Sequence, residues 1–152
     1  FYETKYHVNY TSSGAVVSAT TYDTGYQKMA AQKDLNGKQT LNIRPAFYIA
    51  GPSRRSIAET FFQSIYKDAS NMQANIFLND VQRVYDSRIT GNEWYLAARK
   101  GTTIKLFFLN GVKTPYVEQR QGWTTDGTEM KVRIDAVAKA LDYRGLYKNA
   151  GA

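Results

Sequence analysis

The 152-residue sequence has no cysteine and a single histidine. Without cysteine the chain cannot form disulfides, cysteine-based zinc sites, iron–sulfur clusters or a thiol nucleophile. One histidine cannot supply a two- or three-histidine metal site either. No apolar run approaches the ~18 residues that a membrane-spanning helix needs. These absences exclude cysteine and multi-histidine chemistry and leave no candidate for a helical membrane span.

Most motifs that carry enzyme chemistry are also missing. The histidine, His7, lies in a Thr- and Tyr-rich N-terminal stretch, and no G-x-S-x-G nucleophile motif occurs. Neither glycine-rich phosphate-binding pattern is present. Paired carboxylates, Asp126 with Glu129 and Asp135 with Asp142, keep a hydrolase as a third hypothesis, but their positions are more typical of solvated charges and turns. We therefore expect no catalytic residue, no metal and no cofactor.

Aromatic residues and positive charge are more abundant than usual. Aromatics make up 14% of the chain, with 12 tyrosines, and the net charge is +7. Tyrosine is enriched at contact surfaces because it is large and stiff and has a polar tip. Half-buried strand positions explain the tyrosines equally well, so this alternative stays open.

The basic residues are spread along the chain, and the largest clusters are the pairs Arg54-Arg55 and Arg99-Lys100. This spread favours a solvated surface over a nucleic-acid footprint. A basic nucleic-acid-binding module stays as an alternative, since Lys105 precedes Phe107 and Phe108 in a short aromatic run. The two rings would point to opposite faces of a strand, which weakens that hypothesis.

The length fits one domain, and the hydrophobic pattern predicts an α+β fold with helices early and antiparallel strands late. In the first half, apolar residues recur at helical spacing after Thr21 and again between Ile57 and Tyr66. The expected elements are an extended arm or edge strand over 1–20, a helix from 21 to about 33, a strand over 46–50, a helix over 54–67 and a loop over 68–75.

The second half is expected to be rich in β-strands. Asn110-Gly111 predicts a hairpin turn, because both positions must adopt positive φ. Pro115 marks an edge or broken strand. Residues 129–135 alternate, which predicts a half-buried strand with Met130, Val132 and Ile134 inward. The expected strands are 81–85, 94–98, 103–109, 112–119, 129–135 and part of 136–147.

Several ordered motifs in this half resemble the C-terminal part of tailed-bacteriophage and prophage major capsid proteins. The likeness is closest to the Mu-like head-protein group, which is often fused behind a ClpP-like prohead protease. The motif positions in this sequence are Trp94, Gly111, Pro115, Glu118, Gly122, Asp126, Gly127, Lys131, Arg133, Asp135, Asp142, Arg144 and Gly145. Earlier segments also fit, among them Gln32-Lys33-Asp34 and Asn42-Ile43-Arg44-Pro45.

The resemblance implies the Hong Kong 97-like capsid fold, with an axial domain and the last strands of a peripheral domain. It assigns 21–152 to a single α+β axial domain, with about 128–149 contributing to the peripheral domain. The sequence starts at Phe1, so we expect a piece of a longer subunit whose arm, extended loop and spine helix lie upstream.

The implied function is structural: a major capsid subunit that forms the icosahedral head shell around the genome. Its partners would be other copies of the subunit in pentamers and hexamers, portal, scaffold or protease proteins, and packaged DNA by non-specific proximity, with no membrane. Its location would be the virion capsid, and the bacterial host cytoplasm during assembly. An encapsulin-like shell protein is the alternative within the same fold.

The connection between the second helix and the next strand is a candidate subunit-contact loop at the capsomer axis. An ordinary mobile connection explains it equally well. Its candidate residues are Ser70, Asn71, Met72, Gln73 and Asn75.

Overall fold

The computed structural model describes residues 1–152 except 1, 3–4, 6, 69–72 and 123–125. It divides the chain into two units, which are Phe1–Thr103 with Asp142–Ala152, and Ile104–Leu141. The division differs from the single domain expected over 21–152. Because β11 (Leu146–Asn149) pairs inside the sheet of the first unit, residues 146–149 do not group with 128–133 as expected.

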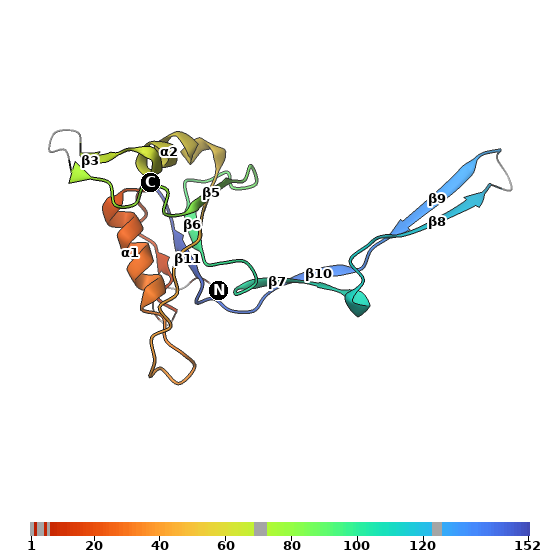
Figure 1. Ribbon diagram of the computed structural model, residues 1–152, viewed down its shortest axis with the longest axis horizontal. Coiled ribbons are helices and arrows are strands. Elements are labelled where there is room, and N and C mark those ends of the chain that lie inside the picture. Colours follow the sequence, from red (N-terminus) through yellow and green to blue (C-terminus); the bar gives the residue numbers. More distant parts are fainter. Residues whose placement is uncertain (1, 3–4, 6, 69–72, 123–125) are drawn as a thin grey trace. The chain divides into compact units, whose positions relative to one another are not determined.

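The first unit contains two helices, a five-stranded sheet and a small hairpin (Figure 1). Its helices are α1 (Ala19–Ala30) and α2 (Arg55–Gln63), with a 3-10 turn at Pro52–Arg54 before α2. Its other strands are β1 (Tyr10–Thr11), β2 (Phe47–Ala50), β3 (Tyr66–Asp68), β4 (Gln73–Ala74), β5 (Gln82–Tyr85) and β6 (Trp94–Ala97).

The large sheet has the order β1-β11-β6-β2-β5. β6 pairs antiparallel with both β11 and β2, whereas β1–β11 and β2–β5 are parallel pairs. The sheet is therefore mixed. A strand from the C-terminal end of the chain lies between the N-terminal β1 and β6, so the sheet needs both ends of the chain.

Five fully buried aromatic side chains form the centre of the core: Tyr22, Tyr48, Phe62, Trp94 and Tyr147. Tyr48 contacts Phe62 and Trp94 with ring centroids 5.3 and 5.7 Å apart. Trp94 in turn lies 5.8 Å from Tyr147. Edge-on and tilted ring pairs of this kind are worth about 0.5–1.5 kcal/mol beyond area burial. Three tyrosines are therefore core residues, which explains part of the tyrosine excess without an interface.

Helix α1 begins two residues before the predicted start because Ser18 caps it. The Ser18 hydroxyl accepts a hydrogen bond from the Thr21 N–H, and the Thr21 hydroxyl accepts one from the Ser18 N–H. The predicted apolar face is confirmed at Tyr22 and Met29, which are buried. Gly25 on this face leaves no room for a side chain, since an added Cβ would lie 2.8 Å from the Tyr147 ring.

Helix α2 is shorter than predicted and ends at Gln63 instead of residue 67. Ser64 turns to extended backbone, and Ile65 is 68% exposed. The cause lies further along the chain, where the Asn75 side chain donates hydrogen bonds to the carbonyls of Phe61 and Ser64. The expected loop at 68–75 likewise contains part of the β3–β4 pair.

The second unit is a two-stranded ribbon in two parts. Its elements are β7 (Ile104–Phe108), a 3-10 turn (Leu109–Gly111), β8 (Tyr116–Gln121), β9 (Thr128–Arg133) and β10 (Ala136–Ala140). β7 pairs antiparallel with β10, and β8 pairs antiparallel with β9.

The predicted hairpin at Asn110-Gly111 is wrong, although both residues adopt positive φ, at 52° and 73°. β8 takes β9 as its partner, and the Leu109 N–H donates to the Asp135 carbonyl, which continues the β7–β10 pairing. Pro115 has no N–H to offer a β7 partner. The dipeptide therefore makes the local turn that its conformation predicts but joins strands that do not pair.

Two core tyrosines differ in the fate of their hydroxyls. The Tyr22 hydroxyl donates to Asp80 Oδ2 at 2.6 Å, whereas the buried Tyr48 hydroxyl has no hydrogen-bond partner among the described residues. Burial raises the pKa of both hydroxyls, so both remain protonated at neutral pH.

We expect Tyr22→Phe to lower the free energy of unfolding by about 1–2 kcal/mol, because it removes a hydrogen bond to a carboxylate. Tyr48→Phe should leave it unchanged or raise it by up to about 1 kcal/mol, because it removes a buried hydroxyl without a partner. Urea denaturation of both variants measures the difference. Equal losses would show that the Tyr48 hydroxyl is hydrogen-bonded.

Candidate subunit interface

The β8–β9 part of the ribbon has one charged face. Residues directly opposite in an antiparallel pair share a face. The cross-strand pairs on this face are Tyr116–Arg133, Glu118–Lys131 and Arg120–Glu129. Arg120 Nε lies 2.6 Å from Glu129 Oε2, and Lys131 Nζ lies 3.9 Å from Glu118 Oε2. Each exposed pair contributes at most about 1 kcal/mol, but Arg120 and Lys131 each have a glutamate as counter-charge across the strands. This face is suited to water.

Arg133 completes the charged face. Its guanidinium lies 5.7 Å from the centre of the Tyr116 ring, and its Nε lies 3.7 Å from Asp135 Oδ2. Glu129 and Asp135, two members of the carboxylate pairs considered above, therefore each have an arginine beside them.

The opposite face of β8–β9 is apolar at its centre, where Val117 faces Val132 and Gln119 faces Met130. The alternation predicted for 129–133 is confirmed, since Met130 and Val132 share the face opposite Glu129, Lys131 and Arg133. The expectation that these residues are half-buried is wrong. Val132 is 64% exposed and Met130 is 63% exposed, because no described residue of the ribbon itself covers this face.

The β7–β10 part has a second apolar face that the sequence pattern did not reveal. Large side chains on one strand face alanines on the other, in the pairs Ile104–Ala140, Leu106–Ala138 and Phe108–Ala136. Leu106 is 58% exposed. Only the pairing of β7 with β10 brings these residues together, and that pairing is not written in local spacing.

A two-stranded ribbon is marginally stable by itself, and large exposed apolar patches mark interaction sites. Among the described residues of the ribbon, twelve large apolar side chains are exposed. They are Ile104, Leu106, Phe107, Leu109, Val112, Tyr116, Val117, Met130, Val132, Ile134, Val137 and Leu141. Exposed apolar side chains in this number are typical of an interaction surface.

The candidate catalytic residues are divided between the two units. Asp126 is exposed at a turn of the ribbon, and Asp142 lies in the first unit beside Arg144. His7 stacks on the Tyr143 ring with centroids 3.7 Å apart. Within the described ranges, no group of three or more histidine, aspartate or glutamate side chains could hold a metal ion.

The nucleic-acid hypothesis receives no assembled platform from β7. Phe107 and Phe108 lie on opposite faces of the strand, as expected from their adjacency. Lys105 faces Lys139 across the β7–β10 pair. One pair of facing lysines is not the basic groove with successive stacking rings that binds single-stranded nucleic acid.

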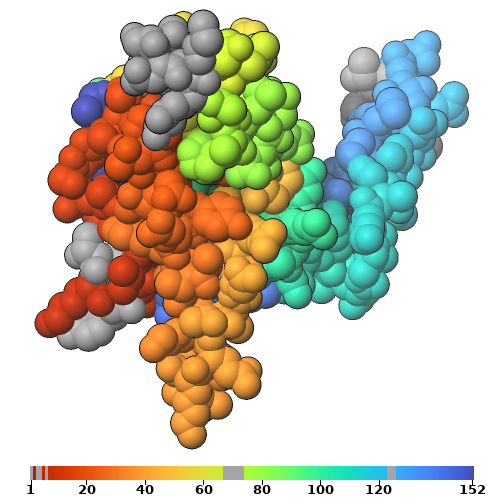
Figure 2. All heavy atoms as spheres, turned by 60° about the vertical axis from the view of Figure 1, so that its left-hand side comes forward, coloured from red at the N-terminus to blue at the C-terminus, as the bar shows by residue number. Residues whose placement is uncertain are grey.

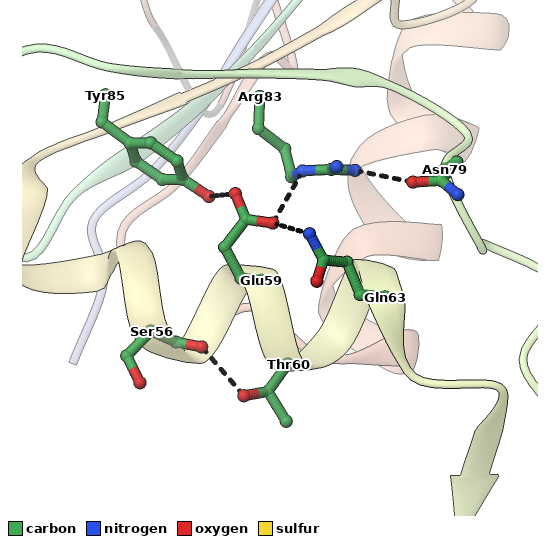
Figure 3. A network of polar contacts seen from close by, with 7 residues as sticks. All are labelled: Ser56, Glu59, Thr60, Gln63, Asn79, Arg83 and Tyr85. Atoms are coloured by element: carbon green, nitrogen blue, oxygen red, sulfur yellow. Dashed lines mark hydrogen bonds and ion pairs between the residues drawn. The ribbon is translucent and has the colours of Figure 1, made fainter.

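Glu59 on α2 is the centre of a polar network that could be mistaken for an acid–base site (Figure 3). Its carboxylate accepts hydrogen bonds from the Tyr85 hydroxyl at 2.8 Å and from Gln63 Nε2 at 2.6 Å, and lies 3.1 Å from Arg83 Nε. Arg83 Nη1 also donates to Asn79. The network fastens α2 to β5 through paired polar groups, which indicates a structural role.

The Tyr85 hydroxyl in this network is protonated at neutral pH. Burial, and then the hydrogen bond to Glu59, raise the pKa of Tyr85 above its usual value. Its hydroxyl is therefore a fixed donor at neutral pH and not a proton acceptor.

The model of a family described as phage capsid protein matches residues 3–149. The chain belongs to this phage capsid protein family. No curated protein and no solved structure matches it. The family is a structural one, and its members assemble with other capsid subunits into the virion capsid.

Four of the motif positions of this capsid chain lie in its first unit. Trp94 is buried, and its Nε1 donates to the Ala15 carbonyl at 2.9 Å. Asp142 accepts hydrogen bonds from the backbone and the guanidinium of Arg144. Gly145 has no space for a side chain, because a Cβ would meet Thr103 Cγ2 at 2.4 Å. These motif residues are explained by packing.

The remaining motif positions outside the charged face are turn residues of the ribbon. Gly111 has positive φ, and Pro115 is exposed just before β8. The Gly122 N–H donates to the Gly127 carbonyl at 2.8 Å and closes the β8–β9 hairpin. Asp126 adjoins this closure. These motif positions are therefore residues of turns and close packing, and the charged motif residues within β8 and β9 lie on the charged face of that pair.

The candidate contact loop is described only in part. Ser70, Asn71 and Met72 lie outside the described residues, and Gln73 lies in β4. Asn75 is buried, and its side chain also accepts a hydrogen bond from the Phe77 N–H. The hydrogen bonds of Asn75 explain why α2 ends at Gln63, and Asn75 itself lies below the surface. None of the chain's described helices is long and apolar enough to span a membrane.

Two glutamate–arginine pairs allow a matched comparison of burial. Glu59 and Arg83 are mostly shielded, whereas Glu129 and Arg120 are largely exposed. We expect Glu59→Gln to lower the free energy of unfolding by about 1–3 kcal/mol, because Arg83 loses its counter-charge in a shielded place. Glu129→Gln should cost less than about 1 kcal/mol. Urea denaturation tests this order, and a reversed order would contradict the structural role of Glu59.

Proposed function

We propose that this capsid chain is part of a shell subunit of Hong Kong 97-like fold, whose copies form an icosahedral head around the phage genome. The family match and the mixed α+β architecture support this proposal. In this proposal the parent belongs to the Mu-like head-protein group and meets portal, scaffold or protease proteins during assembly in the host cytoplasm. Packaged DNA is a non-specific neighbour.

Within the proposal, the first unit is the axial domain and the ribbon is the chain's contribution to the peripheral domain. The expected boundary near residue 128 shifts to 104, because β7 pairs with β10 as part of the same ribbon. The other boundary shifts from 149 to 141, because β11 belongs to the large sheet. The contact loop at 70–75 is proposed to lie near the capsomer axis.

The observation that carries the proposal is the apolar face that each part of the ribbon, β8–β9 and β7–β10, leaves exposed. A monomeric domain would bury Val132, Leu106 and their neighbours. We propose that other capsid polypeptide covers this apolar face in the assembled shell. Obligate interfaces of this type are large and resemble a domain core cut in two.

Electron microscopy of the complete capsid protein under assembly conditions is the direct test. We expect closed shells from the wild type, and none from Val132→Lys, which places a charge on the apolar face. Lys131→Gln, one position away on the charged face, is the matched control and should assemble.

Two results would contradict this proposal in different ways. Failure of the wild-type capsid protein to form shells or capsomer rings would reject the shell function. Normal shells from Val132→Lys would retain that function but reject the ribbon's apolar face as a contact.

A further inference from the structure

The segment after α1 forms a well-defined projection, which we call the tip and define as residues 33–40. Lys33 and Thr40 form an antiparallel bridge, and the Asp34 N–H donates to the Gln39 carbonyl at 2.9 Å. The Asp34 carboxylate accepts the N–H of Lys38 at 3.0 Å. Figures 1 and 2 show this segment, in orange, projecting beyond the C-terminal end of α1. Its internal hydrogen bonds give the tip a definite shape.

The tip presents one large apolar side chain between two cations. Leu35 is 91% exposed, more than any other large apolar side chain among the described residues. Lys33 and Lys38 on either side are exposed as well. The Asp34 carboxylate accepts backbone N–H groups of the tip itself. Gly37 provides the positive φ, 68°, that the turn needs.

A groove lies along the N-terminal part of α1 in the same unit. One hollow of about 760 Å³ is lined by α1 residues from Ala19 to Gln27 and by the segment 74–77. A second hollow, of about 520 Å³, shares Ala19, Thr20 and Asn75 with the first and extends to Ile57 and Tyr66. Together these two hollows form what we call the groove.

The groove is apolar on one side and acidic on the other. Ile76 on its edge is 81% exposed, and Phe77 lies beneath it. Asp23 is the charged side chain among the described lining residues of the two hollows, and its carboxylate accepts a hydrogen bond from Gln27 at 2.7 Å. Among the described residues no cation pairs with Asp23. The groove thus complements the tip in both apolar character and charge.

The groove wall is fixed before any partner arrives. Asn75 holds the 74–77 segment against α2 with hydrogen bonds at 2.6 and 3.0 Å to the carbonyls of Phe61 and Ser64. The tip is fixed by its bridge and by the Asp34 side chain. Association between two preformed surfaces loses little conformational entropy, which favours specific contacts of modest area.

We propose that the tip of one copy inserts into the groove of the next copy. In this contact Leu35 packs on Ile76 and Phe77, and the tip lysines lie beside Asp23. The tip follows the C-terminal end of α1, whereas the groove runs along its N-terminal turns, so the contact is head-to-tail. Heterologous contacts of this kind close into rings when the rotation between copies permits. This inference rests on the proposed shell function and names one contact within its rings.

The absence of native cysteine permits a clean cross-linking test. A double variant of this chain, Leu35→Cys with Ile76→Cys, is oxidised at high protein concentration and separated on a non-reducing gel. Head-to-tail contact predicts a ladder beyond the dimer, because each copy links to two neighbours. Each single variant should stop at the dimer. Leu35→Cys with Val84→Cys, at an exposed position outside the groove, is the matched control.

The charge arm of the test uses light scattering of the same chain. Asp23→Lys should weaken self-association about tenfold, the loss of roughly one shielded charge pair of 1.4 kcal/mol. Adding Lys33→Glu and Lys38→Glu to that variant should restore it. The proposal is overturned if the Ile76 pair cross-links no faster than the Val84 control, or if the reversed charges do not rescue.

The outcomes separate this contact from the shell function. Shells from the complete capsid protein without preferential cross-linking would reject the tip–groove contact and retain the shell. A ladder from the double variant without shells from the complete protein would retain the contact and reject the shell.

Discussion

The first unit depends on the hydrogen bonds that fasten the C-terminal strand β11 to the N-terminal segment. Asn149 in β11 is buried, and its side-chain oxygen accepts the N–H groups of Ala15 and Gly151, each at 2.9 Å. The Ala15 carbonyl in turn accepts the indole N–H of Trp94. Loss of this buried amide would leave backbone donors unpaired, at a cost of about 1–3 kcal/mol each. The two ends of the chain therefore hold each other in one sheet.

In the sequence, the ribbon is an insertion between β6 and β11, which are neighbouring strands of the large sheet. The Asp142 N–H donates to the Thr103 carbonyl at 3.3 Å, and Gly145 packs directly on Thr103. The chain thus leaves and re-enters the first unit at adjacent residues. An inserted segment with adjacent ends leaves the host sheet unchanged and adds little loop-closure entropy. The connection does not determine the ribbon's apolar face, which must be explained by what covers it.

The spacing of apolar residues predicted the features that depend on neighbouring residues, and it did not predict the features that depend on residues far away in the sequence. The buried stripe of α1 and the alternation of Met130 and Val132 in β9 follow from spacing alone. The end of α2 does not follow from spacing, because the side chain that hydrogen-bonds to the carbonyls of Phe61 and Ser64 belongs to Asn75, which comes after β3 and β4 in the chain. The partner of β7 was missed for the same reason. Asn110-Gly111 describes a turn correctly, but strand pairing is a competition that the β8–β9 hairpin wins.

The contrast between the two units bears on how a shell of such subunits assembles. The aromatic core of the first unit is closed by its own chain, whereas Leu106 and Val132 of the ribbon are open to water. In the proposed shell, covering the ribbon would stabilise it by about 25 cal/mol per Å² of apolar surface. Part of that gain offsets the ordering of a marginal two-stranded ribbon, so the net affinity is lower than the buried area suggests.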